Sequence, residues 1–313
     1  MKIKQYGYKP TTKFETLTRG TGPRLYIGVE LELDARPDDY GYTNTARRIN
    51  QLWQNTNFRH KAWYPKHDGS LNRGGVELVS HPRTLEAWKQ YGPSDLAAIR
   101  ENFSAPERGY GLHAHVGRII YFHGVKETLN APWIRRITQA LDVEFIVATC
   151  RRYNSFYARM TLPKESAYDY TRYTFVNSTP DTTVEFRGGA ATTRDDRFFT
   201  YVEFVHSVTM FSLSVSDRML VKRNASIQRA YYNFVLQHQV EYANLYASAK
   251  QIIANVEPAH VKPRYKNPRP IVSTRMAFKC YTGRRRARLL APIVDAVRAA
   301  SQITVPSTTT TGV

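Results

Sequence analysis

The sequence predicts an α+β protein, and three observations lead to this class. Strand patterns cluster in the earlier part of the chain, and two long helical patterns follow at residues 195–222 and 226–254. Several strand segments alternate apolar with polar residues, as expected for a sheet with one buried face. The sequence contains no internal repeat. An order in which strands precede helices favours a sheet with helices packed against it.

The first elements are expected after a polar, basic lead-in at residues 1–23. Residues 24–35 (RLYIGVELELDA) form the first clear strand pattern. In residues 44–56, apolar side chains recur on one face at helical spacing, which predicts a helix. Residues 63–81 predict two strands joined by a Gly-rich turn.

The next helix is predicted to begin after Thr84, a residue type that commonly caps helix N-termini. Gly92-Pro93 is expected to interrupt this helix, because proline lacks the backbone N–H that the helix needs. Residues 110–121 then predict another strand.

Asn130, followed by Ala131-Pro132, predicts the start of a further helix that continues through Phe145 and Ile146. Residues 181–187 predict the last strand, and the two long helices follow. We therefore expect one main domain at 24–255, and a basic C-terminal extension at 256–313 whose tail is disordered.

Composition excludes several classes of protein. The chain has no run of eighteen apolar residues, and its first ten residues lack the apolar core of a signal peptide. Cys150 and Cys280 are too few for a disulfide framework or a cysteine-based zinc site. We therefore expect a non-secreted, cytoplasmic protein without a membrane partner.

The formal net charge of +19 is unevenly distributed. Residues 251–313 contain eleven Lys/Arg and two Asp/Glu, a net charge of +9, which leaves +10 for residues 1–250. Such a segment permits weak contact with a nucleic acid or another polyanion. A solvated tail or a packing arm is the more common explanation of such a charge.

Three strand segments each carry two polar residues separated by one apolar residue: Glu30-Leu31-Glu32, His113-Ala114-His115 and Glu185-Phe186-Arg187. Successive side chains of a strand point to opposite faces, so each polar pair shares one face while its apolar neighbours share the other. A buried sheet face is normally apolar. These segments therefore predict a site on one face of the sheet and a core beneath the other.

Glu30 and Glu32, together with Asp68 and Glu77 of the predicted hairpin, would gather four carboxylates. Two unit charges roughly 4 Å apart repel by about 4 kcal/mol where the effective dielectric constant is about 20. Such a cluster needs cations or strong hydrogen bonds, and oxygen ligands favour Mg²⁺ or Mn²⁺ over zinc. Any one of these acids, taken alone, is more commonly a surface carboxylate.

His113 and His115 permit two readings. They are suitable ligands of a zinc or cupin-like site, which needs a further histidine and a carboxylate nearby, or they contact phosphate or a metal-bound oxygen. Glu185 and Arg187 combine a hard metal ligand with a guanidinium suited to bidentate recognition of carboxylate or phosphate. Taken alone, that last pair is also explained by an ion pair on a solvent-facing sheet.

Taken in order, the segments that carry these residues match one known pattern. They are Ile27-Gly28-Val29-Glu30-Leu31-Glu32, Asp68-Gly69-Ser70-Leu71 with Gly75-Val76-Glu77-Leu78-Val79-Ser80, Gly111-Leu112-His113-Ala114-His115-Val116, and Val184-Glu185-Phe186-Arg187 before a long helix. Over residues 24–255 the chain resembles the amidoligase family, ATP-dependent carboxylate–amine ligases of the glutamine synthetase and glutamate–cysteine ligase superfamily. It is similar to the version often carried by bacteriophages, which implies the host cytoplasm.

The resemblance implies a glutamine synthetase-like fold, in which a curved, mainly antiparallel sheet has helices on its convex side and binds ATP and Mg²⁺ on its concave face. It implies that Glu30, Glu32, Glu77 and Glu185 bind metal, and that Asp68 belongs to the metal and substrate site. His113, and after it His115, would contact nucleotide phosphate or metal. Arg187 would stabilise the transferred phosphoryl group or the substrate carboxylate, beside the nucleotide.

The implied reaction begins with phosphorylation of a small-molecule or peptide carboxylate by ATP, because a carboxylate is a poor electrophile and an acyl phosphate has a good leaving group. An amine then attacks and gives an amide, ADP and phosphate. Asp68 is our choice for the group that accepts the proton of the amine.

Two positions depart from the family pattern. The residues after Arg187 are Gly188-Gly189-Ala190, where relatives often have a bulkier apolar residue, and His81 separates Ser80 from Pro82. A competing hypothesis is a non-catalytic nucleic-acid-binding or virion-associated protein on a ligase-like fold. The basic extension motivates it, whereas the presence of all five acids favours the enzyme.

Overall fold

The computed structural model describes one compact unit, which lies within residues 1–213 and 217–259. It also describes Ser214–Ser216, which are grouped apart from that unit. The predicted basic extension at 256–313 lies outside the described residues, as do residues 18–23. The described ranges are 2–5, 7–17, 24–34, 42–71, 74–106, 109–122, 125–153, 155, 158–160 and 173–255. No helix in these ranges is both long and apolar enough to span a lipid bilayer.

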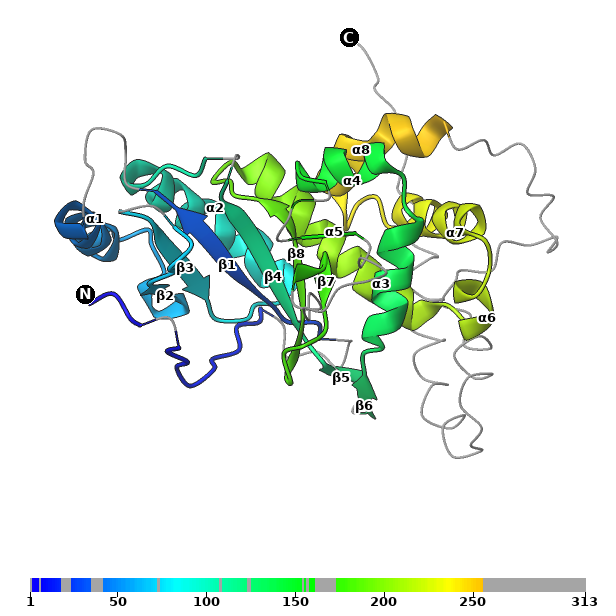
Figure 1. Ribbon diagram of the computed structural model, residues 1–313, viewed down its shortest axis with the longest axis horizontal. Helices are drawn as coiled ribbons and strands as arrows, with labels where there is room; N and C mark the ends of the chain where they lie inside the picture. Colours follow the sequence, from blue (N-terminus) through cyan, green and yellow to red (C-terminus); the bar gives the residue numbers. More distant parts are fainter. Residues whose placement is uncertain are drawn as a thin grey trace, which may run out of the picture. The chain divides into compact units, whose positions relative to one another are not determined.

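A six-stranded sheet forms the centre of this unit (Figure 1). All of its strand pairs are antiparallel, which together with the helices confirms the α+β class. Its strands, in spatial order, are β2 (Trp63–Lys66), β3 (Val76–Ser80), β1 (Ile27–Leu33), β4 (Gly111–Gly117), β8 (Thr183–Ala190) and β7 (Val176–Asn177). Strands β5 (Ile119–Phe122) and β6 (Val125–Thr128) form a separate hairpin.

One face of the sheet is covered by helices α2 (Leu85–Asn102) and α5 (Asp195–Ser214) (Figure 1). The indole of Trp88 donates a hydrogen bond to the Ile27 carbonyl at 2.9 Å, and the Tyr201 hydroxyl donates one to the Phe186 carbonyl at 2.9 Å. The alternate residues of the strands that form the apolar core are completely buried, and they are Val29, Leu31, Leu33, Leu112, Ala114, Val116, Val184 and Phe186.

A second core lies among the helices that follow or flank the sheet. Its centre is aromatic: Phe145 packs against Tyr231 and Tyr232, and Phe211 also contacts Tyr231. The remaining helices are α1 (Tyr42–Gln54), a short 3₁₀ turn η1 (His60–Ala62), α3 (Ala131–Ala140), α4 (Val143–Cys150), α6 (Asp217–Leu220), α7 (Asn224–Gln237) and α8 (Ala243–Asn255).

The predicted helix starts are confirmed by their caps. The Thr84 side chain accepts a hydrogen bond from the Ala87 N–H, and the Asn130 side chain accepts one from the Trp133 N–H. The prediction that Gly92-Pro93 interrupts α2 is wrong, because α2 continues through Pro93 to Asn102. A β-carbon on Gly92 would lie 2.9 Å from the Phe199 ring, so this glycine lets α2 pack tightly against α5. That packing offsets the backbone hydrogen bond that proline cannot make.

The predicted helix lengths are also wrong, because three long patterns are divided. The helix expected from Asn130 through Ile146 breaks at Leu141 and resumes as α4, and 195–222 is divided into α5 and α6. The pattern 226–254 is divided into α7 and α8. Here the buried Glu203 carboxylate accepts a hydrogen bond from the Leu245 N–H at 2.8 Å, which stabilises a new helix start.

The described part of the lead-in pairs with the sheet margin. The Lys4 N–H donates to the Pro65 carbonyl, and the His67 N–H donates to the Lys4 carbonyl. Further along, Glu15 forms an ion pair with Arg83, whose completely buried guanidinium also binds Asp95 at 2.7 Å. Lys4 thus covers part of the free edge of β2, and Glu15 is fastened beside Arg83, which follows β3.

A β-bulge lies where β4 and β8 pair. Leu112 faces Gly189 and Ala114 faces Phe186, so Arg187 and Gly188 of β8 together oppose His113 of β4. The ring of Phe175 occupies the space above Gly188, where a β-carbon would lie 1.8 Å from its Cε2 atom. The glycine at position 188 therefore has a packing reason in this chain.

Gly188→Ala is expected to lower the free energy of unfolding by about 2–3 kcal/mol, because Phe175 has to leave its position. Gly69→Ala is the control, since nothing lies within 4 Å of a β-carbon there. Thermal or urea unfolding of both variants checks this. Equal midpoints for the two variants would contradict the tight contact with Phe175.

Candidate metal centre

The second face of the sheet carries the predicted polar residues side by side. In the strand register, Glu32 of β1 lies opposite Glu77 of β3, and Glu30 lies opposite His113 of β4. His115 of β4 likewise lies opposite Glu185 of β8. Residues opposite one another in a sheet project from the same face. We call this set the acid–histidine cluster: Glu30, Glu32, Glu77, His113, His115 and Glu185.

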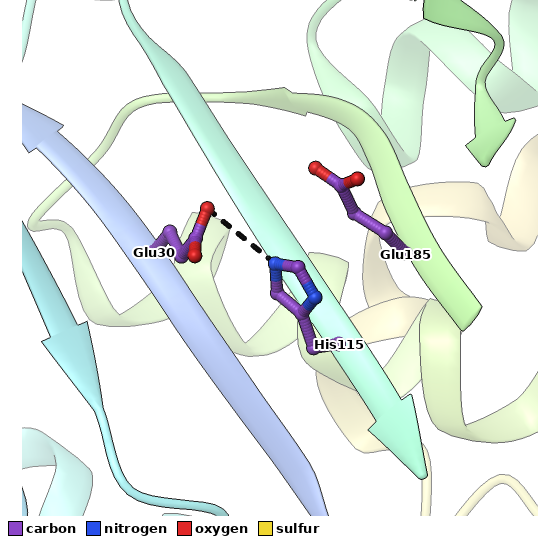
Figure 2. A group of neighbouring side chains, drawn as sticks. All are labelled: Glu30, His115 and Glu185. Atoms are coloured by element: carbon purple, nitrogen blue, oxygen red, sulfur yellow. Dashed lines mark ion pairs between the residues drawn. The ribbon is translucent and has the colours of Figure 1, made fainter. Parts of the chain in front are cut away.

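Figure 2 shows Glu30, His115 and Glu185 on three neighbouring strands, with their side chains on the same side of the sheet. The Nε2 atom of His115 lies 3.4 Å from Oε2 of Glu30, the ion pair drawn in the figure. The strand pairing of β1, β4 and β8 thus brings together residues that are up to 155 positions apart in the sequence.

His113 lies among three carboxylates. Its Nδ1 atom is 3.8 Å from Glu30 Oε2 and 3.8 Å from Glu185 Oε1, and its Nε2 atom is 3.9 Å from Glu32 Oε1. These separations are longer than hydrogen bonds, and the His113 side chain is 7% exposed. A histidine so placed shares its surroundings with acids on both neighbouring strands.

Two groups of three residues in the cluster bring ligand atoms within 4.8 Å of one another. One group is Glu30, His115 and Glu185, and the other is Glu30, Glu77 and His113. Glu30 belongs to both. Each group offers two carboxylates and one imidazole, a donor set that several divalent metal ions accept with water completing the shell. Within the described ranges, neither group joins the two histidines in the way that a bis-histidine zinc site requires.

Four bonds from other residues hold the carboxylates in place. Arg187 Nη1 lies 2.5 Å from Glu185 Oε1, and Asn177 donates to Glu185 Oε2 at 2.6 Å. Lys66 Nζ lies 3.1 Å from Glu77 Oε2. The backbone N–H of Gly111 donates to Glu32 Oε2 at 2.5 Å. Glu185, Glu77 and Glu32 therefore keep defined directions, which a preorganised metal site requires.

The charges in the cluster shift its pKa values in a consistent way. Burial alone would lower the pKa of His115, but Glu30, Glu185 and Glu77 outweigh burial and raise the pKa to about 9. For Glu30, burial would raise the pKa, but His115 and His113 hold it well below its usual range. At neutral pH, His115 is therefore protonated and stabilises the ionised Glu30 carboxylate.

The other two shifted acids differ from each other. Burial raises the pKa of Glu77 to about 8, helped by the negative charge of Glu30 and opposed by Lys66. The pKa of Glu185 is lowered in spite of burial, because His115 and Arg187 stabilise its charge. Glu77 therefore holds its proton more tightly than Glu185 in the absence of a further cation.

Asp68 lies apart from the two ligand groups. It follows β2, and its Oδ1 atom accepts hydrogen bonds from the backbone N–H and the hydroxyl of Ser70, both at 2.8 Å. Its charge contributes to the raised pKa of Glu77, which places it at the margin of the cluster. The role of Asp68 as proton acceptor stays a prediction.

Several residues of the site were not predicted from the sequence. Lys66 was findable, because its position opposite Glu77 follows from pairing the two strands of the expected hairpin. Asn177 had no signal, since β7 contains two residues only. Tyr64 lies on β2, and burial together with Glu30 and Glu77 raises the pKa of its phenol. Arg152 follows α4 and also had no strand or motif to mark it.

Comparison with models of known protein families finds no match for this chain. A sequence comparison with curated proteins also finds no match.

Proposed function

We propose that the protein is an ATP- and Mg²⁺-dependent ligase that joins a carboxylate to an amine through an acyl phosphate, on a glutamine synthetase-like sheet. The convergence of Glu30, Glu77 and Glu185 with two histidines on one sheet face carries this proposal. The resemblance of the four sequence segments supplies the reaction class. Three acids far apart in the sequence that meet beside an arginine are what such a reaction needs.

The residues fit a divalent ion. Glu77 Oε2 and His115 Nε2 are buried side-chain atoms without a hydrogen-bond partner of good geometry in the described part of the chain, although Lys66 and Glu30 lie within ion-pair distance of them. Buried polar atoms normally have such a partner, and a metal ion would supply one. Glu30, Glu77, Glu185, His113 and His115 would hold the metal. When bound, Mg²⁺ would neutralise charge on the nucleotide phosphates.

The chain's own residues would position the reactants. Arg187, held by Glu185, presents a guanidinium beside the cluster, where it would stabilise charge on the transferred phosphoryl group. Asn177 would keep the Glu185 carboxylate oriented, because it occupies the second carboxylate oxygen. Asp68, at the margin, would take the proton of the incoming amine.

The alternative function, a non-catalytic nucleic-acid-binding or virion-associated protein, stays a hypothesis. Its motivation is the basic C-terminal extension, which lies outside the described residues. Deletion of residues 260–313 tests it separately, since loss of nucleic-acid retention with intact metal binding would assign that affinity to the extension.

Trapping of the acyl phosphate tests the ligase proposal without knowledge of the amine. The purified protein is incubated with Mg-ATP, hydroxylamine and pools of carboxylates. Hydroxamate and ADP are expected in equal amounts and only when a carboxylate is present. Arg187→Gln is expected to lower the rate by about 100-fold or more, the usual cost of removing one charge-stabilising donor.

Arg194→Gln is the matched control for that variant. It removes the same charge from an exposed guanidinium that pairs with Asp196 on the surface, so the rate is expected to stay within about twofold of the wild type. ADP release that does not depend on any carboxylate, or release of AMP and pyrophosphate, would overturn the proposed reaction.

A further inference from the structure

Arg152 belongs to no strand of the sheet and lies just after helix α4, next to the acid–histidine cluster. Helix α4 ends at Cys150, and the next residue, Arg151, adopts a left-handed backbone conformation with φ of 56°. The chain turns sharply there, and the Nη2 atom of Arg152 donates a hydrogen bond to the Tyr110 carbonyl at 2.6 Å. Tyr110 immediately precedes β4, the strand that carries both histidines of the cluster.

One peptide group connects Arg152 to the acid–histidine cluster. The carbonyl of the Tyr110–Gly111 peptide accepts from Arg152, and its N–H donates to Oε2 of Glu32. The electrostatics agree with this proximity. Burial lowers the pKa of Arg152, while the charge of Glu32 acts to raise it and that of Arg187 acts to lower it. Arg152 therefore lies within electrostatic range of both Glu32 and Arg187.

The guanidinium of Arg152 is incompletely paired in the described part of the chain. Of its five N–H donors, one is used by the Tyr110 carbonyl, and no described carboxylate lies within 4.0 Å of it. A partly buried guanidinium cannot lose its proton, and holding it without an anion is costly. Such a residue is suited to receive an anion from solution.

The charge balance of the site also calls for an anion. Four acids, Glu30, Glu32, Glu77 and Glu185, face three permanent cations, Lys66, Arg152 and Arg187, and the protonated His115. A single divalent ion at either ligand group makes the set net positive. Anion binding and metal binding should then strengthen each other, because a bound anion neutralises the excess positive charge that the metal ion creates, and the metal ion neutralises the acids that would repel the anion.

We propose that Arg152 is a second anion-binding guanidinium of this site, which acts with Arg187 to bind an oxyanion between Arg152 and the strand β8. The oxyanion is either a phosphate of the nucleotide or the carboxylate to be activated, since both match the guanidinium fork. The identity of this ligand rests on the proposed function, whereas the anion site itself does not.

Calorimetry of anion binding tests this inference without any turnover. Inorganic phosphate, a non-hydrolysable ATP analogue and acetate are each titrated into the full-length protein with saturating Mg²⁺. Arg152→Gln is expected to weaken binding by about tenfold or more, and Arg152→Lys to recover part of the loss, because lysine keeps the charge but not the fork. Arg151→Gln, which removes the neighbouring exposed guanidinium, is expected to bind like the wild type.

The three titrations also distinguish the two possible origins of the oxyanion, a phosphate of the nucleotide and the substrate carboxylate. A loss confined to phosphate and the ATP analogue assigns the phosphoryl group, and a loss confined to acetate assigns the substrate carboxylate; both support the anion site. Unchanged binding of all three in folded Arg152→Gln overturns it, as does a wild-type protein that binds none of them. Loss of anion binding in Arg152→Gln without any hydroxamate formation by the wild type would overturn the ligase proposal alone.

Discussion

Glu30→Gln is expected to abolish divalent-ion binding at both ligand groups, with a fall in affinity for Mg²⁺ or Mn²⁺ of about 100-fold or more. Glu30 is the one residue common to the two groups, so a single substitution removes an anionic ligand from each. Glutamine has nearly the same shape but offers a neutral oxygen, which hard divalent cations bind much more weakly than a carboxylate. Carboxylate-dependent ADP release should be lost with the metal.

The fold is expected to tolerate this substitution. Glu30 lies at the site face, with a side chain that is 21% exposed, and its strand neighbours Val29 and Leu31 in the core are unchanged. Removal of the Glu30 charge also removes the largest influence that raises the pKa of His115. The imidazole then becomes neutral closer to its ordinary pKa, which relieves the loss of its partner.

Mn²⁺ binding measured by electron paramagnetic resonance, with thermal unfolding in parallel, checks the prediction. Glu144→Gln is the matched control, since Glu144 is an exposed acid of α4 outside the acid–histidine cluster, and its Mn²⁺ affinity should equal that of the wild type. Mn²⁺ affinity that survives in Glu30→Gln would show that the cluster is not a metal centre and would remove the main support for the ligase proposal.

The residues of the acid–histidine cluster were predictable because the side chains of a strand alternate between two faces, so that residues two positions apart share one face. Once Glu30, His113 and Glu185 were placed on strands, a single sheet with the apolar neighbours buried left them one common face. The prediction needed no knowledge of which strand lies beside which. The register that brings Glu30 opposite His113, and His115 opposite Glu185, emerges only from the folded sheet.

The predictions failed where packing between distant segments decides the local structure. Pro93 continues a helix because Gly92 allows α2 to approach the Phe199 ring, and Glu203 stabilises the start of α8 from another helix. Neither effect has a signal within a short window of sequence, since both partners lie far along the chain. Arg152 was missed for the same reason, because its position depends on a turn after α4.

Proton release is the second large effect expected at this site, and it gives metal binding a steep pH dependence. In the metal-free protein, His115 has a pKa of about 9. A metal ion that binds to Glu30, His115 and Glu185 therefore has to displace the proton of His115. Each unit of pH between about 6.5 and 9 should therefore raise the metal affinity by up to tenfold for the one proton displaced.

The stability of the metal-free protein should change in the opposite direction. The native pKa of His115 lies above the value of 6.5 for an unfolded chain, so the native state binds more protons than the unfolded state between pH 6.5 and about 9. The free energy of unfolding then falls as the pH rises through this window, by roughly 3 kcal/mol if His115 acts alone. Glu77, with a pKa raised from 4.5 to about 8, contributes a fall of the same sign between those values.

Thermal unfolding from pH 6 to 9.5, with and without saturating Mn²⁺, separates the two effects. The metal-free midpoint should decrease with pH, and the increase caused by Mn²⁺ should be smallest at pH 6 and largest near pH 9. His115→Gln should flatten the metal-free profile above about pH 8, where Glu77 no longer contributes, whereas His60→Gln, an exposed histidine outside the cluster, should leave it unchanged. Stabilisation by Mn²⁺ that is equal at pH 6 and pH 9 would mean that the ion binds without displacing the His115 proton, and hence away from the group that joins Glu30, His115 and Glu185.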